Sequence, residues 1–382
     1  MKLAGLLAIA LGGAALAEEP PPDPLRLEVS GYLQPQALVK HRPDAVPRDR
    51  WEYGVAGSRA GIILGGHPLD PLRWVVHLVA GAQTIDVVTD ADPVDGDGDG
   101  QADDLVVERQ ATATLEVEEA TVRWAPAPIF EVVFGRLRIP LTVEGVSPNT
   151  ELMFPQRAGP NEVFLSGSDL GLMGVLHFDE VHTTASAGVW NGTGREPSAG
   201  QEGGRGLAVS GRVDWASADF PLVDADVTRE GARVGLGAGV LFRQSLGFDA
   251  AGNDGTETRD LRLAGSLRFA ALGFYLQAEI MRRQISDNLS SRTRAATGAY
   301  GQASYYIPAG PVALAPIARL GWSREDEEIA PRETVYLEAG LAFYPSSEKP
   351  DRARVTLAYV GEQRKTEGED AHGGVIQVQI TF

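Results

Sequence analysis

Residues 129–178 read IFEVVFGRLRIPLTVEGVSPNTELMFPQRAGPNEVFLSGSDLGLMGVLHF, and this stretch decides how the rest of the chain can fold. A strand pattern ends in Arg136 and Arg138. Residues 140–169 are polar and rich in turn-forming residues, and a second strand pattern runs from Gly171 to Phe178. Connections this long without regular structure are uncommon in compact domains and usually serve a function. The sequence therefore predicts two strands joined by a functional loop.

The alternation of apolar and polar residues extends along the rest of the chain. From Leu25 to Lys40, Leu27, Val29 and Leu33 share one face, and mostly polar residues share the other. A period of two predicts a long strand with one apolar and one polar side. With this first strand, fifteen further ranges make sixteen predicted strands: 58–66, 72–85, 112–124, 129–139, 170–178, 182–191, 206–215, 231–244, 258–270, 272–284, 296–307, 311–324, 331–345, 350–362 and 372–382.

The beginning of the chain has the pattern of a secretory signal. Met1 and Lys2 supply positive charge, an apolar run follows, and Ala15-Leu16-Ala17 forms a cleavage motif before Glu18. The alternative, a short membrane helix, is disfavoured because the run is shorter than the roughly 20 residues that span a bilayer. We expect residues 1–17 to be a signal peptide, 18–24 an acidic, Pro-rich leader, and 25–382 a single barrel domain.

Composition narrows the class of protein. The 382 residues include no cysteine, so disulfides cannot hold an exported chain together. The formal net charge of −18 disfavours a nucleic-acid partner, which requires clustered basic residues. After the signal, no apolar stretch is long enough for a membrane helix.

The connections between the predicted strands are alternately short and long, with 216–230 the one exception. This alternation predicts antiparallel hairpins closed into a barrel. A soluble β-sandwich is the alternative, but its strands are usually about 5–6 residues, whereas membrane strands need about 9–11. A sheet in lipid must close, because an unpaired edge is not tolerated there. We therefore predict an all-β, transmembrane antiparallel barrel of about sixteen strands. Its N-terminus is periplasmic, the loop after the fifth strand folds inward, and Phe382 pairs with the first strand.

Parity along each strand assigns the lumen, since apolar positions face lipid and their neighbours face the interior. Arginine suits oxyanions because its planar fork stays charged, and rings of charge set selectivity in wide pores. The alternative is that arginines and carboxylates simply pair across the wall. The candidate anion-selective residues are Arg136, Arg138, Arg157, Arg319, Arg233 and Arg268, opposed by Glu144, Glu151 and Glu162 on the loop. Further lumen arginines are Arg73, Arg212, Arg243, Arg262, Arg283 and Arg354.

A second candidate site lies in the connection after the third strand, at 95–104. Its sequence DGDGDGQADD places carboxylates at alternating positions and a glycine at the sixth, as at the start of a calcium loop. Val106 stands where such a loop has its final glutamate, so a flexible acidic loop without an ion remains the alternative. The candidate calcium ligands are Asp95, Asp97, Asp99 and Asp103.

Several short segments together resemble the phosphate-selective porin O and P family. The segment VFGRLRIPLT at 133–142 is similar to the family's strand end before its constriction loop, and 189–192, VWNG, resembles another family segment. The same holds for AYGQASYY at 299–306, PIAR at 316–319 and the final QITF. The resemblance implies a trimeric sixteen-stranded barrel that prefers anions. The chain departs from the family pattern in having only four lysines: Lys2, Lys40, Lys349 and Lys365.

These observations predict a porin of the bacterial outer membrane. We expect a water-filled channel, not an enzyme, through which small solutes diffuse, with anions such as phosphate preferred. The expected partners are outer-membrane lipid and two further copies of the chain. The alternative is an outer-membrane barrel with a structural or adhesive role that acts through a calcium-binding outer loop.

Overall fold

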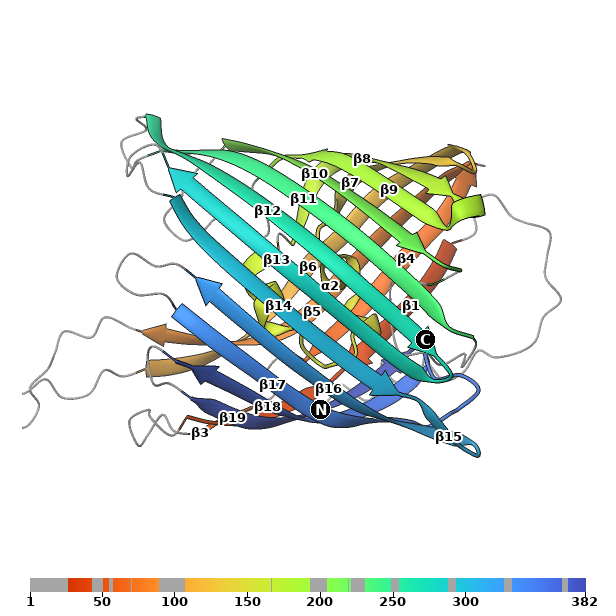
Figure 1. The fold of residues 1–382 in the computed structure, drawn as a ribbon, viewed down its shortest axis with the longest axis vertical. Helices are drawn as coiled ribbons and strands as arrows, with labels where there is room; N and C mark the ends of the chain where they lie inside the picture. The colour runs from red at the N-terminus through yellow and green to blue at the C-terminus, as the bar shows by residue number, and fades with distance from the viewer. Residues whose placement is uncertain are drawn as a thin grey trace, which may run out of the picture.

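The computed structural model describes residues 27–42, 51–54, 58–69, 71–88, 107–165, 167–192, 205–218, 220, 231–248, 254–287, 293–325, 332–365 and 370–382. They form a closed antiparallel barrel (Figure 1). Nineteen strand segments make up sixteen barrel strands, because β1 and β2, β3 and β4, and β14 and β15 are successive parts of single strands. The predicted fold class and strand number are confirmed.

The segments follow the predicted ranges closely, with most ends within a few residues. They are β1 (Leu27–Gln34), β2 (Gln36–His41), β3 (Trp51–Gly54), β4 (Arg59–Leu69), β5 (Leu72–Val88), β6 (Val107–Ala127), β7 (Phe130–Arg138), β8 (Ser168–Phe178), β9 (Thr183–Trp190), β10 (Arg205–Ala216), β11 (Arg233–Phe248), β12 (Asp254–Ala271), β13 (Phe274–Asp287), β14 (Thr293–Tyr305), β15 (Ile307–Ala309), β16 (Val312–Glu325), β17 (Arg332–Tyr344), β18 (Ala353–Arg364) and β19 (Ala371–Thr381).

The barrel closes where its first and last strands meet. Gly31 and Phe382 exchange two backbone hydrogen bonds, of 2.9 Å from the Gly31 amide and 3.0 Å from the Phe382 amide. Tyr32 pairs with Thr381 in the same ladder, and β2 continues the seam along β19. The predicted pairing of Phe382 with the first strand is therefore confirmed, and the seam leaves no free edge there.

The outer face of the wall is apolar. Leu27 and Val29 on β1 are 57% and 60% exposed, and Leu320 on β16 is 60% exposed, although all three are strongly hydrophobic. Many inward-facing positions of the wall are buried and polar, such as Gln34, Gln36, Gln377 and Gln379. This inverted pattern, apolar outside and polar inside, is that of a barrel that spans a membrane. None of the described helices has the length and hydropathy needed to cross a bilayer.

Tight turns at one rim explain why the strands pair with their sequence neighbours. The β12–β13 turn places Leu272 and Gly273 at φ 53° and 94°, and His182 ends the β8–β9 turn at φ 46°. The predicted exception at 216–230 lies at this same rim; Phe220 is described there, and 221–230 lie outside the described residues. The ring of Phe220 packs against Tyr275, with 6.2 Å between the ring centroids, inside the mouth of the barrel.

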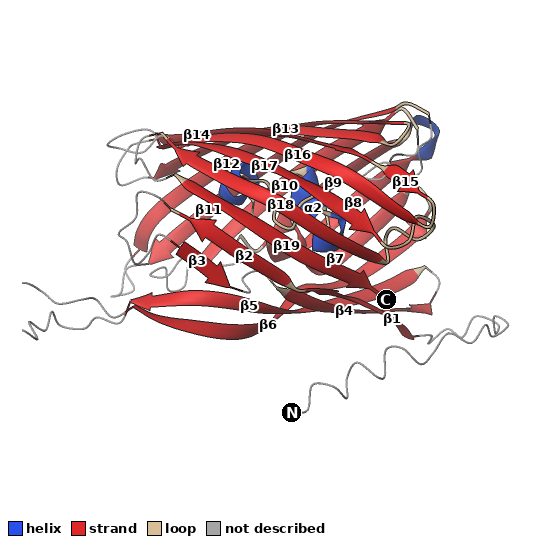
Figure 2. Ribbon diagram, turned by 90° about the horizontal axis from the view of Figure 1, so that it is seen from below, coloured by secondary structure: helices blue, strands red, loops and turns tan. Residues whose placement is uncertain are grey.

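The loop after β7 folds into the barrel, as predicted. It contains α2 (Val143–Val146), η2 (Asn149–Glu151) and α3 (Gly159–Phe164), and Figure 2 shows these helices within the ring of strands. Gly135, within β7 shortly before the loop, has φ 130°. It lies so close to β6 that a Cβ would be 2.0 Å from the Ala120 carbonyl oxygen. Only glycine permits this approach.

Candidate functional site: the loop inside the barrel

The first part of the loop is anchored to β10 and β13. The Leu141 carbonyl oxygen accepts a hydrogen bond of 2.7 Å from Nη1 of Arg212 on β10. The Val143 amide donates to the Glu279 carboxylate on β13 at 2.6 Å. Tyr300 on β14 also donates to that carboxylate. These bonds hold α2 across the interior of the barrel.

Glu144 links the two helical parts of the loop to β16. Its carboxylate accepts from the Ala158 amide at 2.7 Å and from Nδ2 of Asn161 at 2.9 Å. Arg319 approaches the same carboxylate to 3.3 Å and pairs with Glu338 at 2.5 Å. Glu144 and Arg319 are each only 2% exposed. Glu144 was expected on the constriction loop and Arg319 on the lumen wall, and the structure brings the two together in the contact between loop and wall.

The end of the loop is fixed by an arginine pair on β12 and β13. Nη1 of Arg262 donates to the carbonyl oxygens of Phe164 and Leu165 at 2.8 and 2.9 Å. These carbonyls end α3, where a cation is favourable. Asp260 holds Arg262 at 2.6 Å and Arg283 at 2.9 Å. The alternation of apolar and polar residues predicted that both arginines point inward. The structure shows that Arg262 holds the end of the loop.

The middle of the loop reaches the seam of the barrel. Nε2 of Gln34 on β1 donates to the Asn149 carbonyl oxygen at 3.2 Å, and Nε2 of Gln379 on β19 donates to that of Thr150 at 2.9 Å. The loop therefore leaves the wall at β7, is bonded first to β10 and β13, then to β1 and β19 at its middle, and to β12 at its end, before the chain continues into β8. It lies across the interior and narrows it.

A cluster of charges lies where the loop meets β4 to β7. Arg138 pairs with Glu118 on β6 at 2.7 Å and donates to the Val146 carbonyl oxygen of the loop at 3.2 Å. Arg157 on the loop donates to the Ser147 carbonyl oxygen and to Oδ1 of Asn149, both at 3.0 Å. Arg59 on β4 lies near enough to act on Arg157 electrostatically. We call Arg59, Arg138, Arg157 and Glu118 the tip cluster.

The tip cluster has an excess of positive charge. Three guanidiniums face one carboxylate, which leaves a formal charge of +2 when His77, 3.4 Å from Glu118, is neutral. Burial of Arg157, together with the charge of Arg138, lowers the pKa of its guanidinium to about 10. Arg157 therefore keeps its charge at neutral pH. Arg138 and Arg157 were predicted as site residues, and the structure brings them together.

The other predicted arginines lie apart from the tip cluster. Arg136 forms the last register pair between β7 and β6, opposite Ala120, and its guanidinium is 3.6 Å from Glu116. Arg233 and Arg268 lie at the short-turn rim with their guanidinium carbons 5.4 and 5.0 Å from the ring centre of Phe220. Arg268 is only 1% exposed. These three arginines therefore contact Glu116 or Phe220, outside the tip cluster.

Of the remaining predicted carboxylates, only Glu151 has a side chain that the structure describes. Glu151 lies on η2 and is partly exposed. Glu162 belongs to α3, but its side chain is outside the part that the structure describes, as are Asp95, Asp97, Asp99 and Asp103. Among the side chains that are described, no group of three or more carboxylate or histidine residues is arranged to hold a metal ion.

Sequence reasoning missed two members of this site. Arg59 is the second residue of the predicted strand 58–66, and its register pair with Gln34 puts it on the lumen side. His77 sits among apolar residues of β5, and its ring packs edge-on against Tyr32 with 5.7 Å between centroids. Parity could have found Arg59, but only the folded loop shows that both residues face its tip.

The structure is similar to known outer-membrane channels. It matches the outer membrane channel DcaP of Acinetobacter baumannii with a TM-score of 0.58 and 10% identity, covering 93% of this chain and 97% of that one. The match to OmpF of Salmonella typhi has a TM-score of 0.58 and 13% identity, covering 94% and 98%. An anion-selective porin from Comamonas acidovorans matches at 0.53 and 13%, covering 94% and 99%. No protein-family model and no curated protein sequence matches the chain.

At these identities the likeness establishes the fold alone, and the fold is that of the outer-membrane porins. A closed sixteen-stranded barrel with an apolar outer face locates the protein in the bacterial outer membrane.

Proposed function

We propose that the protein is a porin through which small hydrophilic solutes diffuse passively, without catalysis. The observation that carries the proposal is the inward loop, which is bonded to β10, β13, β16, β1 and β19 and so forms a fixed constriction. A constriction built from buried hydrogen bonds and ion pairs has one defined shape, which suits a permanent filter. A barrel of sixteen strands is wide enough to leave an aqueous passage beside such a loop.

The passage prefers anions in this proposal because of the tip cluster. The whole chain is acidic, but charge on outer connections is screened beyond about 8–10 Å at physiological salt. Charge at a constriction acts at close range between low-dielectric walls. Glu144 shares Arg319 with Glu338 and also acts on Arg157, so counting it reduces the formal +2 of Arg59, Arg138, Arg157 and Glu118 to +1. The charge at the constriction is still positive, and in this proposal it outweighs the acidic residues of the outer connections.

Phosphate is one anion that the cluster suits, because guanidinium forks match phosphate oxygens. The sequence resemblance to the phosphate-selective porin O and P family supports this choice. We extend the proposal to export, with residues 1–17 removed as a signal and 18–24 left as a leader before the barrel.

The protein assembles as a homotrimer in this proposal, and the wall beside the loop supports it. The β6–β7 ladder ends at the pair Ala120 and Arg136. The N-terminal part of β6, from Val107 to Glu119, is paired with β5 alone. An open strand edge in a membrane needs a covering partner. A neighbouring copy is the partner that symmetry makes available. The native mass of the detergent-extracted protein tests this, and a monomer would contradict it.

A structural calcium ion in the connection between β5 and β6 is a further part of the proposal. It rests on the spacing of Asp95, Asp97, Asp99 and Asp103, since carboxylate oxygens at alternating positions suit Ca²⁺. Calcium should protect this connection from protease, and Asp97→Ala with Asp99→Ala should remove the protection. Equal cleavage with calcium and with chelator would reject the ion.

Single-channel recording in planar bilayers tests the proposed function. The wild-type protein should give stable conductance steps that grow with salt concentration. A variant that lacks 147–157, replaced by a short Gly-Ser linker, should give larger steps because the tip of the constriction is gone. A wild-type protein that inserts but conducts no ions would reject the porin function and favour a structural or adhesive barrel.

A further inference from the structure

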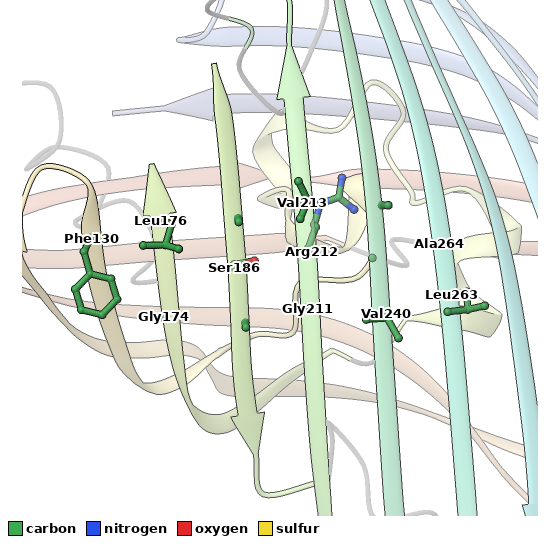
Figure 3. A pocket seen from close by; sticks show the side chains of 14 residues that line it. Phe130, Gly174, Leu176, Ser186, Gly211, Arg212, Val213, Val240, Leu263 and Ala264 are labelled. Atoms are coloured by element: carbon green, nitrogen blue, oxygen red, sulfur yellow. The ribbon is translucent and has the colours of Figure 1, made fainter. Parts of the chain in front are cut away.

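An apolar groove lies on the outer face of the barrel, over β8 to β12. Its volume is about 770 Å³, and its floor consists of small outward-facing residues such as Gly174, Ala187 and Gly211. Larger side chains form its sides, including Leu176, Val240 and Leu263 (Figure 3). In the membrane this groove faces lipid.

The strand register continues the groove into a row of polar residues. Gly174, Ala187, Gly211, Val240 and Leu263 are successive cross-strand pairs on one row of the outer face. The next members of the same row are Arg282, Thr297 and Arg324. Neighbouring strands are about 4.8 Å apart, so Arg282 lies one strand beyond the end of the groove.

The arginines mark the headgroup level of the bilayer. On the outer face of β13, the residue two positions before Arg282 is Ile280, which is 61% exposed. On β16, the residue two positions before Arg324 is Trp322, and two positions before that is Leu320, which is 60% exposed. A change from apolar residues through an aromatic to charged residues is typical of the membrane interface. The level lies toward the rim with the long connections.

The charges in the row favour an anion. Arg282 and Arg324 are exposed, two strands apart and on either side of Thr297. Glu333, the next residue in the row, acts on Arg324 electrostatically and is itself bonded to Lys365 at 2.6 Å and to Trp322 at 3.0 Å. Of the residues whose contacts are described, none forms a hydrogen bond or ion pair with Arg282. A phosphate between the two guanidiniums would receive charge-assisted hydrogen bonds from both.

We infer that this surface binds an anionic, phosphate-bearing membrane lipid. The phosphate lies on Arg282 and Arg324, and one acyl chain lies in the groove toward Gly211. The groove accounts for the chain, and the arginines account for the charge of the headgroup. No residue of the loop or of the tip cluster lines the groove, so the inference does not depend on what passes through the barrel.

Native mass spectrometry of the detergent-purified full-length protein tests the inference with two lipids of equal chain length. Dioleoyl phosphatidylglycerol should be retained over dioleoyl phosphatidylcholine. Arg282→Gln with Arg324→Gln should weaken retention of phosphatidylglycerol by about tenfold or more, because two charge-assisted bonds are lost. Arg259→Gln is the matched control, since Arg259 is also exposed on the outer face of β12 but pairs with Glu257 at 2.9 Å.

The groove is tested separately by filling it. A Cβ at Gly211 would meet its nearest neighbours at 3.7 and 3.8 Å, which is ordinary van der Waals contact. Gly211→Leu should lower retention of both lipids, whereas Ala339→Leu, an outward residue of β17 away from the groove, should not. Equal retention by the double arginine variant and the wild type, equal retention of the two lipids, or an unaffected Gly211→Leu would each overturn the inference. If Gly211→Leu fails to fold, Ala187→Leu replaces it.

Discussion

Two regions of the interior use the same side chains for different purposes. Where the loop meets β10 to β16, Arg212, Arg262 and Arg319 are each at most 4% exposed and bonded to loop carbonyls or paired carboxylates. In the tip cluster, 12% of the Arg138 side-chain surface is exposed to solvent, and positive charges outnumber negative ones. Arg138 also bonds a carboxylate and a loop carbonyl, so the two regions differ in exposure and in charge balance rather than in the kind of partner. In the proposed function, the partly exposed arginines with excess positive charge are the ones that act on solutes.

The largest expected effect comes from breaking the anchoring region. Arg319→Met leaves Glu144 and Glu338 buried without their cation, which costs about 3–5 kcal/mol for a buried pair that loses one partner. The variant should unfold at clearly lower denaturant concentration and expose the loop to protease. Arg259→Met, on the exposed outer face, should unfold like the wild type. Equal stability of Arg319→Met and the wild type would show that the loop is not held there.

A smaller effect in the same region is expected at Tyr300. Its hydroxyl donates to Glu279, which also accepts from the Val143 amide. Tyr300→Phe keeps the ring but removes the donor, at a cost of about 1–3 kcal/mol for the buried acceptor. Denaturant unfolding in vesicles measures this. The ion selectivity should stay that of the wild type, and a reversed selectivity would move Tyr300 into the filter.

The smallest effect is expected at Arg136, which the sequence places beside Arg138. Arg136 is about one-third exposed at the edge of the β6–β7 ladder, where it pairs with Glu116. An ion pair this exposed contributes roughly 0–1 kcal/mol. Arg136→Gln should therefore change stability little and selectivity less than Arg138→Gln does. A larger selectivity change in Arg136→Gln than in Arg138→Gln would relocate the filter to this edge.

The fold could be predicted from the sequence because it depends on local patterns. Alternation gave strands such as 72–85 and 206–215, and the turns gave their order. The inward direction of Arg212, Arg262 and Arg319 also followed from parity alone. The loop contacts could not be predicted in this way. Leu141 and Arg212 are 71 residues apart in sequence, and Arg319 and Glu144 are 175 apart. No periodicity encodes which wall an irregular loop will touch, so parity could not separate anchoring arginines from those of the tip cluster.

The reversal potential across a planar bilayer with asymmetric KCl tests the central claim most directly, namely that the tip cluster sets the ion preference. The wild type should prefer chloride at low salt, and Arg59→Gln with Arg138→Gln should weaken or invert that preference, while Arg259→Gln leaves it unchanged. A wild-type channel that prefers potassium, or a double variant with the wild-type reversal potential, would contradict the account.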